Sequence, residues 1–346
     1  MLRGLRMVTV ALLLLSGGGL VSADLSRHAA PATVVLAAAR SKAQCHGITH
    51  GEVRGDKPTY TRKRLAAFPN SQRLCHGIWL PNPRRYLVPQ GIAIRDNTAW
   101  LSGFRFREGY GERPCQLVRV DLVTGRRLAY HTAIYGKVGS RPRTYCRHGG
   151  GILQRGRWLW IVEKNKLWLV DPSARTSVLD ARRVWRIREP VRGSAIVLRG
   201  GRLGLVPYQK TGHPHIYWFS MRGLLQRGML DLSVRGNGRT RLGAYAATRI
   251  PRYTQGATTD SHARLYLTRS NLSCAELVTP FGKRMAFVPG AEGLQFAAGD
   301  RRLWSVSESG AWPYVRSRKP LTPAVSSFEF PRLMRGRRAS CGFPAY

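Results

Sequence analysis

Polar side chains recur directly before glycines that open short apolar stretches of this chain, as in Gln90-Gly91 and Glu292-Gly293. Where the residue before the glycine is itself a glycine, at Gly150, a histidine stands two positions earlier and can take its place. If these positions converge, their amide, imidazole, guanidinium and carboxyl groups form a mixed polar ring, which is the chemistry of a site for a small molecule or a peptide. The alternative is that the positions are polar because water fills the space between them. The predicted ligand-binding residues are Gln90, His148, Arg192, Gln255, Glu292 and Glu308.

Two glutamates stand out because the chain has only 18 acidic residues against 57 lysines and arginines. Glu163 follows Trp160 by three residues and Glu308 follows Trp304 by four. At the rim of a site, such a carboxyl group can serve as a general acid or base. The abundance of arginine favours the alternative that each glutamate pairs with a neighbouring arginine. Whether the protein is an enzyme is therefore left open.

The other clusters of reactive residues do not form a catalytic or metal-binding motif. Asp260, Ser261 and His262 are consecutive, whereas a catalytic triad is assembled from separated segments. His213 and His215 share a turn without a third metal ligand, and no cysteine pair has the spacing of a zinc site.

Five segments share one hairpin pattern, in which a glycine, an apolar stretch and a turn precede a second strand with an aromatic residue or a glycine at its middle. From the leading glycine to that middle residue the distances are 9, 9, 11, 10 and 11 residues. Such constancy over unrelated intervening residues indicates one hairpin repeated five times. The pairs are Gly91 and Trp100, Gly151 and Trp160, Gly193 and Gly204, Gly256 and Tyr266, and Gly293 and Trp304.

A third and a fourth strand follow in most units, for example over residues 117–122 and 127–132. Short strands separated by Gly, Pro and Asp turns are typical of all-β proteins, and four strands repeating every roughly 40–60 residues are typical of a β-propeller. We therefore predict an all-β fold, a single β-propeller of five or six four-stranded blades over residues 90–346. Residues 45–89 lack the hairpin and are either a cap across one face or a degenerate blade.

The repeated hairpins and their polar-Gly starts, over roughly residues 85–330, resemble the NHL-repeat and senescence-marker-protein/gluconolactonase group of propellers. For an enzyme of that group the resemblance implies a divalent cation in the channel, held by the Glu of a Glu-Gly-Pro motif together with Asn and Asp. Glu292-Gly293 matches two of these positions, but Leu294 replaces the proline and the other blade starts lack Asn and Asp. Arg192 would repel a cation there, and calcium needs 6–8 oxygen ligands. No cofactor is predicted, and calcium is the one metal that the resemblance brings into consideration.

Residues 1–23 have the three parts of a cleaved secretory signal: Arg3 and Arg6, an apolar run over 8–15, and small residues ending at Ala23. The apolar run is shorter than the about 20 residues of a membrane span. No later segment is long enough either, so we expect a secreted protein without a membrane span. Residues 24–44 are predicted to form a flexible, Ala-rich lead-in.

All six cysteines follow the predicted cleavage site. An even number of cysteines in an oxidising compartment indicates disulfides, although the pairing cannot be read from the sequence. A bond between Cys45 and Cys75 would suit either a cap or a degenerate blade.

The formal net charge is +39, or +37 once Arg3 and Arg6 leave with the signal. A field of this sign attracts polyanions over long distances and weakens with salt. The densest basic runs, residues 62–64 and 335–338, are short and lack interleaved aromatic residues, so we expect no sequence-specific nucleic acid. The alternative is a solvated basic surface without a dedicated partner.

The sequence thus predicts a secreted, monomeric β-propeller that binds a ligand at its channel face without catalysis. Its basic surface suits anionic polymers of the cell envelope. The alternative is a metal-dependent hydrolase or lyase of the gluconolactonase-like type, because fold alone does not determine function.

Overall fold

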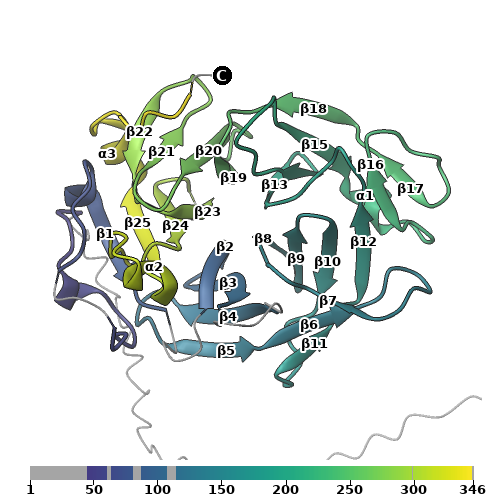
Figure 1. Cartoon of the computed structure of the whole chain (residues 1–346), viewed down its shortest axis with the longest axis horizontal. Helices are drawn as coiled ribbons and strands as arrows, with labels where there is room; N and C mark the ends of the chain where they lie inside the picture. Colours follow the sequence, from purple (N-terminus) through teal and green to yellow (C-terminus); the bar gives the residue numbers. More distant parts are fainter. Residues whose placement is uncertain (1–44, 61–63, 81–86, 107–113, 298, 345–346) are drawn as a thin grey trace, which may run out of the picture. The chain divides into compact units, whose positions relative to one another are not determined.

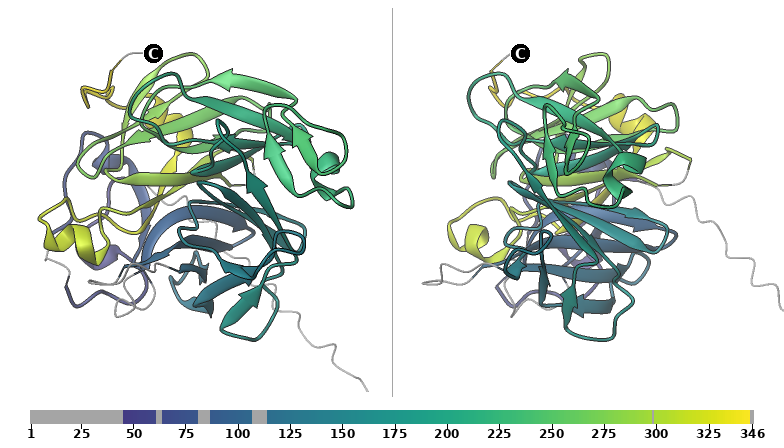
Figure 2. Two further views of the ribbon diagram at one scale, coloured as in Figure 1. Left: turned by 45° about the vertical axis from the view of Figure 1, so that its right-hand side comes forward. Right: turned by 90° about the vertical axis from the view of Figure 1, so that its right-hand side faces the viewer.

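The computed structural model describes residues 45–60, 64–80, 87–106, 114–297 and 299–344. Within them, five small sheets stand as blades around a central axis (Figure 1). The two turned views show the blades lying side by side (Figure 2). The predicted all-β propeller is confirmed, with five blades. The predicted signal, residues 1–23, and lead-in, residues 24–44, lie outside the described residues.

Each blade has four strands that pair in antiparallel order from the axis outward. Blade 1 contains β2 (Leu87–Arg95), β3 (Thr98–Arg105), β4 (Cys115–Asp121) and β5 (Arg127–His131), and blade 2 contains β8 (Gly151–Arg155), β9 (Trp158–Glu163), β10 (Lys166–Val170) and β12 (Arg183–Ile187). Blade 3 contains β13 (Ala195–Arg199), β14 (Arg202–Val206), β15 (His215–Ser220) and β18 (Ala246–Arg249), and blade 4 contains β19 (Thr254–Thr259), β20 (Leu265–Ser270), β21 (Ala275–Val278) and β22 (Arg284–Phe287). Blade 5 contains β23 (Ala291–Phe296), β24 (Arg302–Ser307), β25 (Val325–Glu329) and β1 (Leu74–Ile78).

The two innermost strands of every blade are the hairpins that the sequence predicted. They are the antiparallel pairs β2–β3, β8–β9, β13–β14, β19–β20 and β23–β24. In blade 3 the connection is Gly200-Gly201, with φ of 52° and 74°. Two successive left-handed residues make the tight turn that matches the twist of paired strands, and glycine adopts that conformation without strain.

The leading glycines are needed because the innermost strands approach one another closely around the axis. Contacts join β2 to β8, β8 to β13, β13 to β19, β19 to β23 and β23 back to β2. A Cβ atom on Gly256 would lie 1.9 Å from the carbonyl oxygen of Glu292, and one on Gly151 would lie 2.6 Å from the backbone nitrogen of Ile196. The repeated glycine is therefore a requirement of the narrow ring, since any side chain there would push neighbouring blades apart.

Apolar and aromatic side chains fill the spaces between neighbouring blades. Trp160 of β9 and Trp185 of β12 stack with ring centroids 5.3 Å apart. Both are buried in one cluster with Phe219 of β15 and with Met221. Blades 2 and 3 thus share a single core, in which stacked aromatic rings stabilise the contact beyond their buried area.

Blade 5 combines a strand from the N-terminal part of the described chain with three strands from its C-terminal part. Its outermost strand, β1, pairs antiparallel with β25, and Figure 1 shows the two side by side. β25 is thus the third strand of this blade. Residues 45–89, for which a cap or a degenerate blade was open, supply the fourth strand. The Cys45–Cys75 disulfide links this strand to the start of the described chain.

The chain leaves blade 3 after β15 and returns to it at β18. Between them lie the helix α1 (Met221–Leu225), β16 (Asp231–Ser233) and β17 (Arg241–Gly243). β16 pairs in parallel with β12, so this excursion adds two strands to the outer edge of blade 2. The carboxylate of Asp231 accepts hydrogen bonds from Arg186 at 2.8 and 3.0 Å and from Arg188 at 3.3 Å, which fastens the excursion to blade 2.

A small sheet lies between blades 1 and 2. It consists of β6 (Ala133–Gly136), β7 (Thr144–Tyr145) and β11 (Val178–Asp180). The Cys115–Cys146 disulfide joins the first residue of β4 to the loop before β8. That loop carries His148, so the disulfide fixes the position of a predicted site residue.

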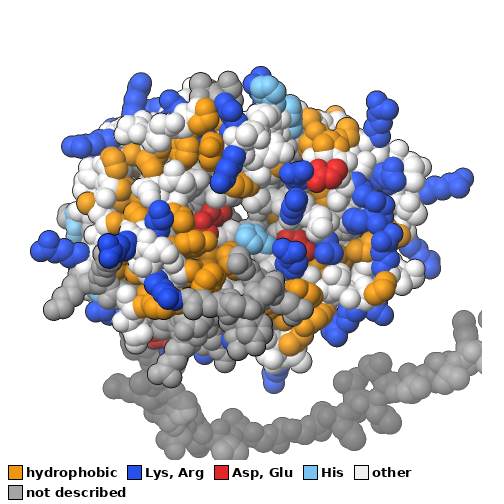
Figure 3. All heavy atoms as spheres, in the orientation of Figure 1, with side chains coloured by type: hydrophobic (Ala, Val, Ile, Leu, Met, Phe, Trp, Pro, Cys, Tyr) orange, Lys and Arg blue, Asp and Glu red, His pale blue; other side chains and the backbone are white. Residues whose placement is uncertain are grey.

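Lysine and arginine side chains are spread over the face of the molecule seen in Figure 3 and are not confined to one patch. Acidic and histidine side chains come to the surface near its centre, around the axis of the blades. Among the described residues, no helix has the length and apolar character that a membrane crossing requires. The three disulfides indicate an oxidising, extracytoplasmic environment.

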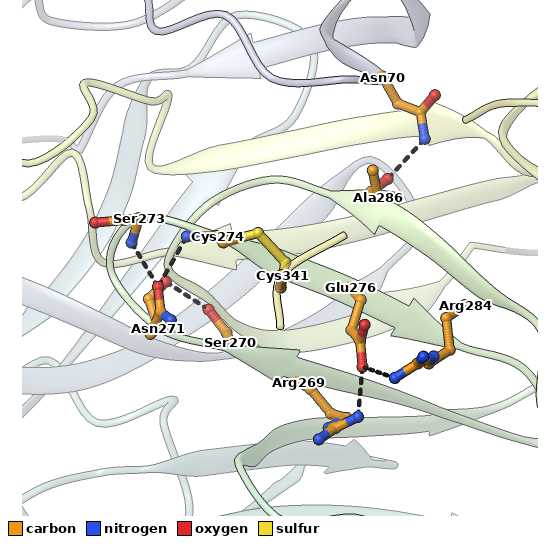
Figure 4. The surroundings of a disulfide bond; sticks show 10 residues. All are labelled: Asn70, Arg269, Ser270, Asn271, Ser273, Cys274, Glu276, Arg284, Ala286 and Cys341. Carbon is orange, nitrogen blue, oxygen red and sulfur yellow. Dashed lines mark hydrogen bonds and ion pairs between the residues drawn. A yellow bond between two sulfur atoms is a disulfide. The ribbon is translucent and has the colours of Figure 1, made fainter. Parts of the chain in front are cut away.

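The end of the described chain is fastened to blade 4 through the Cys274–Cys341 disulfide (Figure 4). Beside it, the buried guanidinium of Arg269 lies 2.7 Å from a carboxylate oxygen of Glu276, while Arg284 lies 3.8 Å from that oxygen. Asn70 donates to the carbonyl oxygen of Ala286. The remaining short helices are α2 (Trp312–Arg316), α3 (Phe330–Met334) and the 3₁₀ turns His50–Glu52 and Ser71–Arg73.

Candidate functional site

Four of the six predicted site residues form one hydrogen-bonded chain at the axis. The amide nitrogen of Gln90 donates to a carboxylate oxygen of Glu308 at 2.8 Å. The amide oxygen of Gln90 lies 3.0 Å from Nε2 of His148, so that nitrogen donates and carries the proton. Glu308 is in turn hydrogen-bonded to Glu292. Blades 1, 2 and 5 each contribute to this chain, which runs across the axis.

Glu292 and Glu308 form a hydrogen-bonded pair of carboxyl groups. Glu292 is buried, and burial together with the charge of Glu308 and the hydrogen bond to it raises the pKa of Glu292 well above its ordinary value. Burial also raises the pKa of Glu308, although hydrogen bonds from Gln90, Glu292 and Tyr314 lower it in part. Two hydrogen-bonded carboxyl groups cannot both ionise without a large cost, so we expect the pair to retain one proton. Glu292 is the donor and Glu308 the acceptor.

The position of His148 is restrained by a ring contact and by a disulfide in its loop. It stacks on the ring of Phe104 with centroids 4.7 Å apart and an angle of 19° between the planes. Two residues before it, Cys146 is tied to blade 1 by its disulfide. His148 is therefore a positioned donor, whose ring is fixed before any ligand arrives.

A cavity of about 350 Å³ opens beside this chain, between blades 2 and 3. We call it the mouth cavity. Its wall comes from the loop before β8, the turn between β9 and β10, the segment before β13 and the segment after β14. The lining residues are Arg147, His148, Glu163, Lys164, Asn165, Lys166, Arg192, Gly193, Ser194 and Tyr208.

Tyr208 connects the mouth cavity with the carboxyl pair. It lines the cavity, and burial together with the nearby charge of Glu292, Tyr253 and Glu308 raises the pKa of its phenol. The phenol thus stays protonated and remains a hydrogen-bond donor over the physiological range. Glu292 and Glu308 are not among the residues that line the cavity.

Four of the side chains around the mouth cavity are cationic, and one, Glu163, is anionic. Glu163 accepts a hydrogen bond from the backbone N–H of Arg147 at 2.8 Å and lies 3.5 Å from the ammonium of Lys166. Arg192 donates through Nε to both carboxylate oxygens of Glu189 at 3.0 Å. The N–H groups of its two terminal nitrogens can therefore still donate to a ligand. Among the described residues, neither Arg147 nor Lys164 has an acidic side-chain partner. The cavity therefore carries a net positive charge.

The prediction that Glu163 and Glu308 each pair with an arginine side chain is wrong. Glu163 pairs with a lysine and a backbone N–H, and Glu308 with Gln90, Glu292 and Tyr314. The reason is their position. Glu163 ends β9 beside a backbone N–H and a lysine, and Glu308 directly follows β24 beside Gln90 and Glu292.

The other two predicted residues lie apart from the hydrogen-bonded chain. Arg192 lines the mouth cavity together with His148. Gln255 lies at a β-bulge of β19, and its side chain makes no hydrogen bond within the described part of the chain. The structure thus brings together five of the six residues, in two adjoining groups that share His148.

Several lining residues were not predicted from the sequence. Lys164 and Asn165 form a strand-to-strand turn, and Tyr208 follows β14. One signal was available for the turn, because Glu163 and Lys166 flank it with opposite charges. Tyr208 had no such signal, since a tyrosine after a strand is common in any β protein.

The donor set at the axis does not fit a divalent cation. It offers only two carboxyl groups, and the amide oxygen of Gln90 already accepts from His148. Within the described ranges, no three His, Cys, Asp or Glu side chains come together as a metal-binding group. Since calcium needs 6–8 oxygen ligands, we derive no chemical step through a metal.

No protein-family model and no curated protein matches this chain. Among solved structures, regucalcin, a calcium-binding protein from Agrobacterium tumefaciens, has 12% identity and a TM-score of 0.41, over 71% of this chain and 91% of its own. The PQQ-bound aldose sugar dehydrogenase of Streptomyces coelicolor has 13% identity and a TM-score of 0.44, over 74% and 97%. The fold is assigned from the five blades described above, and the chain is a five-bladed β-propeller.

Proposed function

We propose that this protein is a secreted, non-catalytic binding protein that takes an anionic group, a carboxylate or phosphate on a saccharide or polymer end, into the mouth cavity. The observation that carries this proposal is the chemistry of the cavity wall. Cationic side chains and neutral donors converge on one concave space whose volume lies in the range of small-ligand sites.

Each group has a part in holding such a ligand. The free terminal NH₂ groups of Arg192 can donate two parallel hydrogen bonds to one anionic group. Lys164 adds a second positive charge. Ser194 and Asn165 offer a hydroxyl and an amide, which suit the hydroxyl groups of a sugar.

The charge of the whole chain supports the same ligand class. A net charge of +39 attracts an anionic polymer from a distance, and the cavity then selects its end. Long-range attraction is screened by salt, whereas a partly buried contact is screened much less. Binding that persists at physiological salt is therefore the signature of the cavity.

Arg192→Glu is expected to weaken retention on a carboxylate-bearing polymer such as polygalacturonate about tenfold to 100-fold, since a hydrogen bond between charged groups contributes about 1.5–3 kcal/mol. The measurement is retention on immobilised polymer at about 150 mM salt, with neutral dextran as the blank. Arg175→Glu is the matched control, because it makes the same charge change at an exposed residue outside the cavity. Equal losses in the two variants would contradict the proposal, as only net charge would then matter.

A second candidate function, hydrolysis by acid–base chemistry, has one observation in its favour. Glu292 and Glu308 share a proton, and paired carboxyl groups of this kind serve as acid and base in some hydrolases. Lactone or ester turnover that disappears in both Glu292→Gln and Glu308→Gln would establish it. Binding is preferred because neither carboxyl group lines the mouth cavity.

A further inference from the structure

We propose that a groove between blades 2 and 3, separate from the mouth cavity, binds a single-chain anionic amphiphile. We call it the inter-blade groove. The aliphatic chain would lie on Trp158, Met221 and Leu225. The carboxylate or phosphate head would lie among the rim arginines, which are Arg155, Arg182, Arg222 and Arg227.

The groove exists because the chain leaves blade 3 to extend blade 2. α1 follows β15 directly, and β16 then crosses to pair with β12. The space between α1 and the outer strands of blade 2 is about 1330 Å³. Figure 1 shows α1 beside β15.

The floor of the inter-blade groove is apolar. Trp160, Leu169 and Met221 are buried members of the core shared by the two blades, and their edges reach the groove. Leu225 at the end of α1 is 52% exposed, an unusual degree for a leucine beside a core. Methionine and leucine side chains adapt readily to a flexible chain.

The rim supplies charge of one sign. Five of the thirteen lining residues are arginines, and none is acidic. Arg183 is occupied, since it donates to the carbonyl oxygen of Met229 at 2.9 Å and lies over the ring of Trp185. The four rim arginines have no acidic partner among the described residues. Charge complementarity therefore selects an anionic head above an apolar tail.

The size of the groove favours an extended aliphatic chain. Its volume exceeds the usual range of compact small-molecule sites, which is about 300–1,000 Å³. A neutral hydrocarbon would leave the arginines unused, and a free phosphate would leave the apolar floor exposed. An amphiphile with one alkyl chain satisfies both.

The inter-blade groove and the mouth cavity lie at opposite ends of β9. Trp158 begins this strand in the groove, and Glu163 ends it in the cavity. At about 3.3 Å per residue, the two ends are roughly 16 Å apart. The two sites share no lining residue, so each proposal can fail without the other.

Calorimetric titration of dodecyl phosphate, below the concentration at which it self-associates, tests the groove. We expect one site per chain, with affinity about 15-fold higher than for decyl phosphate, because two more methylene groups are buried. Leu225→Asp and Arg227→Glu should each weaken binding at least about tenfold. Inorganic phosphate and dodecyl glucoside, which carry the head charge or the chain alone, should bind much more weakly.

Two control variants make the test specific. Leu128→Asp changes a leucine that is 49% exposed on β5, and Arg175→Glu changes an exposed arginine elsewhere, so neither should alter the affinity. Equal weakening by controls and groove variants, or no dependence on chain length, would overturn the proposal. A dimer that grows with protein concentration and that Leu225→Asp dissolves would overturn it too, since a second copy would then occupy the groove.

Discussion

Glu276→Gln is expected to lower the free energy of unfolding by about 3–5 kcal/mol, because it leaves a buried positive charge without its partner. The side chains of Arg269 and Glu276 are 0% and 2% exposed, and their charged atoms lie 2.7 Å apart. Arg269 also donates to the carbonyl oxygens of Arg252 and Pro344. Removing the partner of Arg269 is therefore expected to weaken its contact with the C-terminal segment as well. Urea unfolding at neutral pH measures the change.

An exposed pair provides the control. Asp96 lies 3.9 Å from Arg95 with a side chain that is 90% exposed, so Asp96→Asn should change stability by less than about 1 kcal/mol. Replacing both buried partners, as Arg269→Met with Glu276→Leu, should recover most of the loss, since no unpaired charge then remains. A loss for Glu276→Gln no larger than that for Asp96→Asn would contradict the buried ion pair.

The free energy of unfolding of the unchanged protein is expected to fall as pH rises, and Glu292→Gln is expected to abolish this fall. The folded-state pKa of Glu292 is raised well above its ordinary value, so the folded chain keeps a proton that the unfolded chain releases. Stability from this proton is complete below the ordinary glutamate pKa and is lost as pH rises toward the folded pKa. In that window the free energy of unfolding falls by about 1.4 kcal/mol per pH unit.

The glutamine variant keeps the hydrogen bond to Glu308 but has no proton to release as pH rises. Its amide donates to Glu308 as the protonated carboxyl did, so its advantage over the unchanged protein should grow with pH and vanish in acid. Thermal unfolding between about pH 4 and pH 8 measures this. Glu52→Gln is the control, because hydrogen bonds from Thr49 lower the pKa of that exposed carboxyl. Parallel pH profiles for Glu292→Gln and the unchanged protein would show that no proton is shared.

Much of the fold could be predicted from the sequence because its main constraint acts locally. The leading glycines mark the places where innermost strands touch, as at Gly256, and tight turns such as Gly200-Gly201 mark the hairpins. The convergence of Gln90, His148 and Glu292 followed from the same pattern, since each stands one to three residues before a leading glycine of an innermost strand. Ligand binding by these residues remains a prediction.

What escaped prediction depends on contacts between distant segments. β1 pairs with β25 across about 250 residues of chain, and β16 crosses from one blade to another, with no local signal for either. The shared proton depends on burial, which the sequence does not show. For that reason Glu308 was expected to meet an arginine, although it meets Glu292.

The most direct test of the central claim is a calorimetric titration of trigalacturonate, with neutral galactotriose as its uncharged counterpart, at about 150 mM salt. The mouth cavity predicts one site per chain for the anionic trisaccharide, weakened at least about tenfold in Lys164→Glu and in Arg192→Glu and unchanged in Arg175→Glu. Many weak sites that all three variants diminish equally, or equal affinity for the neutral trisaccharide, would contradict a charge-selective cavity at the channel mouth.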